Sequence, residues 1–153
     1  MVQIEPVIKL VELLRSATLR TRIGLWYMPL EAAGREREIA VQLSVEAVDV
    51  RTPLRTKIAP GAEYLRLSTV KIIETLDLIA STTGRSDCVL VCNLDLLLSG
   101  VTQKECTQVW EELFNGLPHR SRALLLAIPE TATQVLPDDE LLAAWRRDNR
   151  VAQ

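Results

Sequence analysis

The chain has 153 residues, of which 48% are hydrophobic, so it can bury one sizeable core and we expect a single domain over residues 1–153. A net charge of −2 and a pI near 5.5 give no general attraction to nucleic acid or to an anionic membrane, and no apolar run reaches the ~20 residues of a spanning helix. Three cysteines and one histidine argue against a disulfide framework or a zinc cluster, which predicts buried, reduced thiols in a cytoplasmic protein.

The first half of the chain predicts two helices and two strands. Apolar residues recur at helical spacing within residues 1–18, which indicates a leading amphipathic helix. The apolar run Ile23–Met28 predicts a strand, residues 34–43 a second helix and residues 47–50 a short strand. The polar segment 51–67, which contains prolines and a Pro-Gly pair, is expected to be a long loop with room for one helical turn.

The second half alternates helices with strands. Ser68 is positioned to cap a helix, and Thr102 with Glu105 forms a capping box ahead of another. The expected elements are helices at 69–80, from 103 to Gly116 and from 138 to Trp145, and strands at 88–92, 123–128 and 151–152. This alternation predicts an α/β three-layer sandwich with a mostly parallel sheet of about five strands.

The turn between the first strand and the second helix carries an incomplete phosphate-binding motif. Residues 29–36 can be aligned with G-x-x-x-x-G-K-[ST], in which backbone N–H groups cradle phosphates while the Lys and the hydroxyl reach the β/γ-phosphates and Mg²⁺. Only Gly34 matches a defining position, and Pro29, Arg35 and Glu36 replace the other three. The alternative interpretation is an ordinary β–α turn in some other α/β domain.

These replacements remove what a bound triphosphate needs. Pro29 has no N–H and fixes its φ at about −65°, while Glu36 puts a carboxylate where the Mg²⁺-binding hydroxyl belongs. A carboxylate about 5 Å from a phosphate charge costs on the order of 3 kcal/mol at an effective dielectric near 20. We therefore expect no cofactor, with ATP and Mg²⁺ disfavoured.

Residues 89–97 carry a second incomplete motif. They resemble the strand that ends in hhhh-D-[DE] in ATPases, where the first acid holds Mg²⁺ through water and the second polarises the attacking water. Cys92 and Asn93 occupy those two positions, or Asn93 and Leu94 if the register shifts by one, and only Asp95 remains as an acid. Asp95 capping the following segment, or bonding to a neighbouring loop, is the alternative. The fourth strand ends in Ile128-Pro129, where a polar group sensing the γ-phosphate is usual.

Taken together, the three incomplete motifs resemble a degenerate P-loop NTPase with an AAA+/STAND-like core that spans residues 23–153 and lacks a helical lid. Among small proteins of this class, the chain is similar to the compact P-loop component of bacterial phage-exclusion (BREX) defence systems. The resemblance implies no catalytic residue and no metal. It implies a vestigial nucleotide site at Pro29, Ala33, Gly34, Arg35, Glu36 and Asp95.

The resemblance also implies a role as a non-catalytic interaction or regulatory subunit. Such a subunit would join a homo- or hetero-oligomer, or dock on a larger partner such as an active ATPase, within a DNA-directed or phage-defence complex. In that assembly Arg120 or Arg122 could contact a neighbouring subunit.

Two other functions stay open. In an atypical nucleotide-binding protein with weak or no ATPase activity, Arg35 and the backbone amides of residues 33–36 would hold the phosphates. In a DNA-associated accessory protein, the arginine clusters near residues 15–22, 51–57 and 146–150 would contact the backbone of the duplex. No membrane partner is expected.

Overall fold

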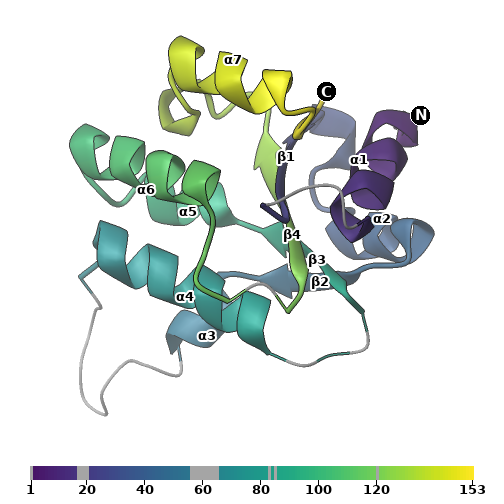
Figure 1. The fold of residues 1–153 in the computed structure, drawn as a ribbon, viewed down its shortest axis with the longest axis horizontal. Coiled ribbons are helices and arrows are strands. Elements are labelled where there is room, and N and C mark those ends of the chain that lie inside the picture. Colours follow the sequence, from purple (N-terminus) through teal and green to yellow (C-terminus); the bar gives the residue numbers. More distant parts are fainter. Residues whose placement is uncertain (1, 17–20, 56–65, 83, 85, 120) are drawn as a thin grey trace.

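The computed structural model describes residues 2–16, 21–55, 66–82, 84, 86–119 and 121–153, and Figure 1 shows their arrangement. Five strands, all parallel, form one sheet in the order β2-β3-β4-β1-β5. Their bounds are β1 (Ile23–Met28), β2 (Glu46–Asp49), β3 (Cys88–Cys92), β4 (Ala123–Pro129) and β5 (Val151–Ala152).

Helices cover both faces of this sheet (Figure 1), so the α/β three-layer architecture is confirmed. One face packs against α1 (Glu5–Arg15) and α2 (Glu36–Leu43). The other packs against α3 (Arg51–Arg55), α4 (Thr69–Ser81), α5 (Leu94–Leu98), α6 (Gln103–Asn115) and α7 (Asp139–Arg147).

The central strands have the composition that two-sided burial requires. Every residue of β1 and β3 is buried, because helices lie on both faces. Side chains alternate between the two faces along a strand. In β1, Trp26 and Met28 therefore pack with α1 and α2, whereas Leu25 and Tyr27 join the core under the other helices.

The expected helix starts are confirmed in atomic detail. The Ser68 hydroxyl accepts a hydrogen bond from the Lys71 N–H, and both bonds of the Thr102–Glu105 capping box are present. The first four N–H groups of a helix have no partner within that helix, so side chains that accept from them fix where it begins.

The structure differs from expectation in two places around the strand ends. The helix expected from residue 34 begins at Glu36, because residues 30–32 form a 3₁₀ turn and Gly34 has a φ of 83°. The short helix α5, which the sequence did not predict, follows Asn93, whose left-handed φ of 66° turns the chain out of β3. In the segment expected to be a loop, α3 supplies a helical turn, and residues 56–65 lie outside the described part.

Candidate functional site

A cavity of about 360 Å³ opens at the carboxyl ends of β1, β3 and β4. The chain leaves β1 toward α2 on one face and leaves β4 toward α7 on the other. Parallel α/β sheets bind ligands in the crevice where neighbouring connections part in this way. The lining residues are Met28, Ala33, Gly34, Glu36, Cys92, Asn93, Asp95, Ala127 and Pro129.

The cavity brings together four of the six residues of the expected vestigial site. Ala33, Gly34 and Glu36 reach it from the turn after β1, and Asp95 reaches it from the start of α5. Pro29 and Arg35 do not line it. The incomplete motifs of the sequence therefore meet in space, although they lie about sixty positions apart along the chain.

The backbone of the turn after β1 is not open to an anion. The N–H groups of Ala32 and Ala33 donate to the carbonyls of Pro29 and Leu30 at 2.9 and 3.1 Å, and the Arg35 N–H donates to the Ala32 carbonyl at 3.0 Å. A phosphate-binding loop needs these donors to point at its ligand. Here they close a 3₁₀ turn instead.

Glu36 completes this closure with its own carboxylate. The Gly34 N–H donates to Glu36 Oε1 at 3.2 Å, so an acid of the chain occupies a position next to the backbone where a phosphate oxygen would bind. Gly34 has a φ of 83°, which side-chain-bearing residues rarely adopt, so this residue is suited to the turn whether or not a ligand binds.

The Arg35 guanidinium is engaged on the surface by Glu38. Its Nε and Nη2 donate to the two carboxylate oxygens of Glu38 at 3.2 and 2.9 Å. This bidentate bond raises the pKa of Arg35 and lowers that of Glu38. The guanidinium that would replace a phosphate-binding lysine is therefore bonded to Glu38, in the first turn of α2.

The opposite wall of the cavity holds Cys92 and Asp95, and the pKa of each is raised above its usual value. Burial, reinforced by the charges of Glu36 and Asp49, raises the pKa of the Cys92 thiol to about 12. Burial is also the main cause of the raised pKa of Asp95, and the negative charge of Glu36 acts in the same direction. The site therefore disfavours further negative charge, and the thiol is not a ready nucleophile.

Sequence reasoning missed a polar network beside the cavity, at the ends of β2 and β3. Asp49 accepts the Arg51 N–H at 3.0 Å and the Arg51 Nη2 at 2.8 Å, and Asn93 Nδ2 donates to the same carboxylate at 3.0 Å. The bond from Arg51 is the largest cause of an Asp49 pKa near 2. The available signal was that polar residues end two successive strands, which in a parallel sheet meet at one edge.

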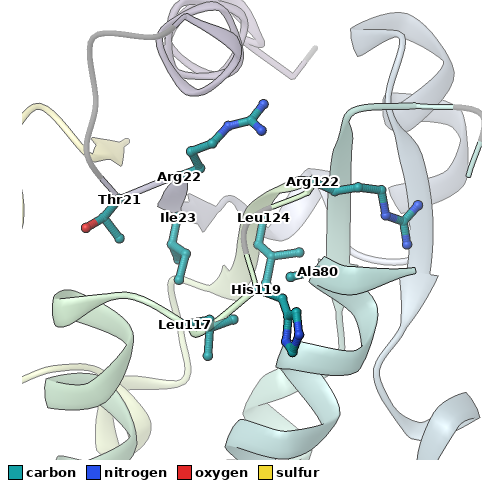
Figure 2. Close-up of a pocket in the computed structure, with 8 residues that line it drawn as sticks. All are labelled: Thr21, Arg22, Ile23, Ala80, Leu117, His119, Arg122 and Leu124. Atoms are coloured by element: carbon teal, nitrogen blue, oxygen red, sulfur yellow. The ribbon is translucent and has the colours of Figure 1, made fainter. Parts of the chain in front are cut away.

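Arg122 lies at the opposite edge of the sheet, where β1 and β4 begin. Figure 2 shows its side chain extending away from Ile23 and Leu124. It is 6% exposed, donates to the Ile79 carbonyl at 3.2 and 2.9 Å, and is ion-paired with Glu46. A contact from Arg122 to a neighbouring subunit would require this buried arrangement to open. Arg120 lies outside the described residues.

A second, much smaller pocket lies beside these residues (Figure 2). Its volume of about 10 Å³ is room for roughly one water molecule, so it is no nucleotide site. His119 lies at its border, with Nδ1 2.7 Å from Asp77 Oδ2 and a side chain that is 62% exposed.

Several arginines of the basic clusters are occupied inside the chain. Arg15 pairs with Asp87 and Arg51 with Asp49, both at 2.8 Å, and Arg150 is 2% exposed. Arg20 and Lys57 lie outside the described residues. The part of each cluster that the structure describes thus presents fewer cations than the sequence suggests.

Within the described ranges, no three His, Cys, Asp or Glu side chains are grouped so that they could hold a metal ion. No described helix combines the length and the apolar character needed to cross a bilayer. The three cysteines are buried and free, as predicted.

Comparison with family models, with curated proteins and with solved structures finds no match to this chain. The class defined by its fold is an α/β protein with a five-stranded parallel sheet. Any more specific assignment has to come from the chemistry of the cavity.

Proposed function

We propose that this chain is a non-catalytic interaction or regulatory subunit, built on a P-loop-like α/β domain, that docks on a larger protein in a multi-protein assembly. In such a subunit the crevice at the carboxyl ends of the strands is retained, whereas the groups that would bind a triphosphate are replaced.

One observation carries the proposal: the donors of the turn after β1 are used up within the chain. The N–H groups of Ala32, Ala33, Gly34 and Arg35 all donate to groups of the turn or to Glu36. A triphosphate would have to break these bonds before it could accept any of them. An enzyme of this layout needs the donors preorganised toward the transferred phosphoryl group.

The charges at the cavity support the same conclusion. Glu36 and Asp95 are the carboxylates of its lining, and none of the described Lys or Arg side chains lines it. A nucleotide needs cations or Mg²⁺ to neutralise its phosphates, and carboxylates in the lining of the cavity oppose that charge instead.

The test is isothermal titration of the purified chain with Mg-ATP, Mg-ADP and Mg-GTP, together with a multiple-turnover ATPase assay. We expect no saturable heat up to millimolar nucleotide and no hydrolysis above background. A matched variant, Arg35→Lys with Glu36→Thr, restores two of the three missing motif positions and should bind more strongly than the natural chain.

Two results would contradict the proposal. A micromolar dissociation constant for the natural chain that Gly34→Pro weakens would make it a nucleotide-binding protein. Turnover of ATP that Arg35→Ala abolishes would make it an enzyme.

A further inference from the structure

The last two elements of the fold, α7 and β5, cover the end of the sheet at β1 (Figure 1). We name residues 139–153 the strap. α7 buries one side chain, Trp145, whereas each of the other described helices of at least eight residues buries between three and six. β5 pairs with β1 over two residues, Val151 and Ala152. So little burial is typical of a segment that opens while the rest of a protein stays folded.

Two buried polar atoms at the strap have no hydrogen-bond partner among the described residues: the Tyr27 hydroxyl and the Trp145 Nε1. Both side chains belong to one apolar cluster. Burial raises the pKa of Tyr27, and the charges of Arg146 and Asp139 also act on it, so the phenol lies near α7. A buried polar group without a partner costs free energy, which is recovered when water reaches it. These two atoms therefore favour opening of the strap.

Arg150 holds the strap closed. Its guanidinium donates to three backbone carbonyls, one in β1 and two in α6, over distances from 2.9 to 3.3 Å. Its central carbon also lies 4.1 Å from the centre of the Trp145 ring. All three carbonyls lie outside the strap, so these bonds exist only while the strap is in place. The closed state therefore depends on a single side chain near its end.

The strap begins where the chain stops being anchored in the core. The Val135 carbonyl accepts the Trp110 Nε1–H at 2.7 Å, and Pro137 is buried, so the chain is fixed up to that point. Asp138 instead accepts the Leu141 N–H at 2.8 Å and so caps α7 itself. The hinge of an opening strap therefore lies between Pro137 and Asp138.

We propose that the strap opens as one unit while the other strands stay paired, that Arg150 is its latch, and that opening gives water access to the Tyr27 hydroxyl and the Trp145 Nε1. This conformational device goes beyond the proposed subunit role and does not depend on it. Opening also leaves the edge of β1 unpaired, and an unpaired sheet edge is a template for pairing with another strand.

Native-state hydrogen exchange of the full chain, followed by NMR, measures this opening residue by residue. A helix of nine residues is marginal alone in water, so α7 loses its hydrogen bonds when it leaves the sheet. The Leu25 N–H donates to the Arg150 carbonyl at 2.8 Å, whereas the Trp26 N–H faces β4 on the other side of β1. We expect residues 143–147 and Leu25 to share one protection factor. Trp26 should match β3 and β4, with protection higher by at least about tenfold.

Three variants separate opening of the strap from unfolding of the whole chain. Arg150→Lys keeps the charge but loses the fork of donors, so it should lower the protection of the strap and of Leu25 about tenfold. Tyr27→Phe removes the unpartnered hydroxyl and should raise that protection about threefold to tenfold. The control, Ile39→Val, removes a methylene from α2 in the opposite layer. It should lower the protection of β3 and β4 about threefold to tenfold and leave that of the strap unchanged.

Three results would overturn the inference. If Ile39→Val lowers the protection of the strap as much as that of β3 and β4, the strap opens only when the whole chain unfolds. If protection rises steadily inward from residue 153 and Leu25 is as protected as Trp26, the terminus merely frays. If Tyr27→Phe lowers protection, the hydroxyl is bonded in the closed strap. The natural chain and Ile39→Val decide the question even where Arg150→Lys does not fold, and none of these results bears on the nucleotide titrations.

Discussion

Arg150 is a buried cation whose guanidinium bonds to three backbone carbonyls. Its guanidinium donates to the carbonyls of Ile23, Phe114 and Leu113 at 2.9, 3.0 and 3.3 Å. Its central carbon lies 4.1 Å from the centre of the Trp145 ring. Burial lowers its pKa to about 10, so it remains charged at neutral pH. One side chain thus ties β1, α6 and α7 together.

Replacing this side chain should be costly. Arg150→Met leaves three buried carbonyls without their donor and loses the cation–π contact, so we expect the free energy of unfolding to fall by about 2–4 kcal/mol. Urea titration followed by circular dichroism measures it. The control is Arg147→Met on exposed α7 surface, which should change stability by less than about 0.5 kcal/mol. Equal losses of stability in both variants would show that the buried contacts of Arg150 are not the cause.

Asp49 makes stability depend on acid pH. Its folded-state pKa is held near 2 by Arg51, below the value of about 3.9 in an unfolded chain. A lowered folded pKa stabilises the protein above the unfolded pKa, and the contribution is lost as pH falls through the folded one. After allowance for solvent at this partly exposed pair, we expect a contribution of about 1–2 kcal/mol to the free energy of unfolding at neutral pH.

The measurement compares the natural chain with Asp49→Asn. The difference in the free energy of unfolding should be constant from pH 7 to pH 5 and shrink between pH 4 and pH 2. A difference that does not change over this lower range would show that the Asp49–Arg51 pair is not the cause.

The site could be predicted residue by residue only where a residue type fixes the chemistry by itself. Pro29 lacks a backbone N–H donor and Glu36 adds a carboxylate, whatever surrounds them in the fold. The partner of Arg35 could not be foreseen, because an arginine three residues before a glutamate on a helix reaches either Glu38 or a ligand.

At the scale of elements, the end of α2 carries a correctable strain. Ser44 has a φ of 57°, and the Val45 N–H donates to the Ala40 carbonyl at 2.9 Å, which is the six-to-one bond of a helix C-terminus. Residues with a Cβ rarely adopt this conformation, whereas glycine adopts it freely.

Ser44→Gly should therefore raise the free energy of unfolding by about 0.5–1 kcal/mol, since the folded state gains more than the unfolded chain. Thermal and urea unfolding check it. The control is Ser16→Gly after α1, where the residue has a φ of −72°, so glycine relieves no strain. It adds freedom to the unfolded chain and removes the bond from the Ser16 hydroxyl to the Leu13 carbonyl, so it should destabilise. Stabilisation by the control, or none by Ser44→Gly, would contradict the argument.

Element prediction succeeded where a continuous apolar run or a capping residue marks the element in the local sequence. The apolar runs of β1 and β3 and the capped starts of α4 and α6 were visible because each signal is local. The five-residue helix α5 was missed, because its Leu-rich run after β3 is too short for a helical period and Asn93 starts it with a left-handed turn.

At the scale of the whole molecule, the strand order could not be predicted. The residues Ile23–Met28 do not indicate that β1 lies between β4 and β5. Strand pairing depends on tertiary packing and not on the sequence of the strand alone. The sequence did predict a parallel sheet, and parallel strands bring their polar ends to one edge. That rule is why three separate weak motifs meet in one cavity.

The sheet also divides the three tryptophans between its faces: Trp26 packs with α1 and α2, and Trp110 and Trp145 lie in the opposite layer with their ring planes at 87°. Each layer consequently carries its own intrinsic fluorophore. The emission of a chain that retains only Trp26 reports the loosening of one layer, and that of a chain that lacks it reports the other.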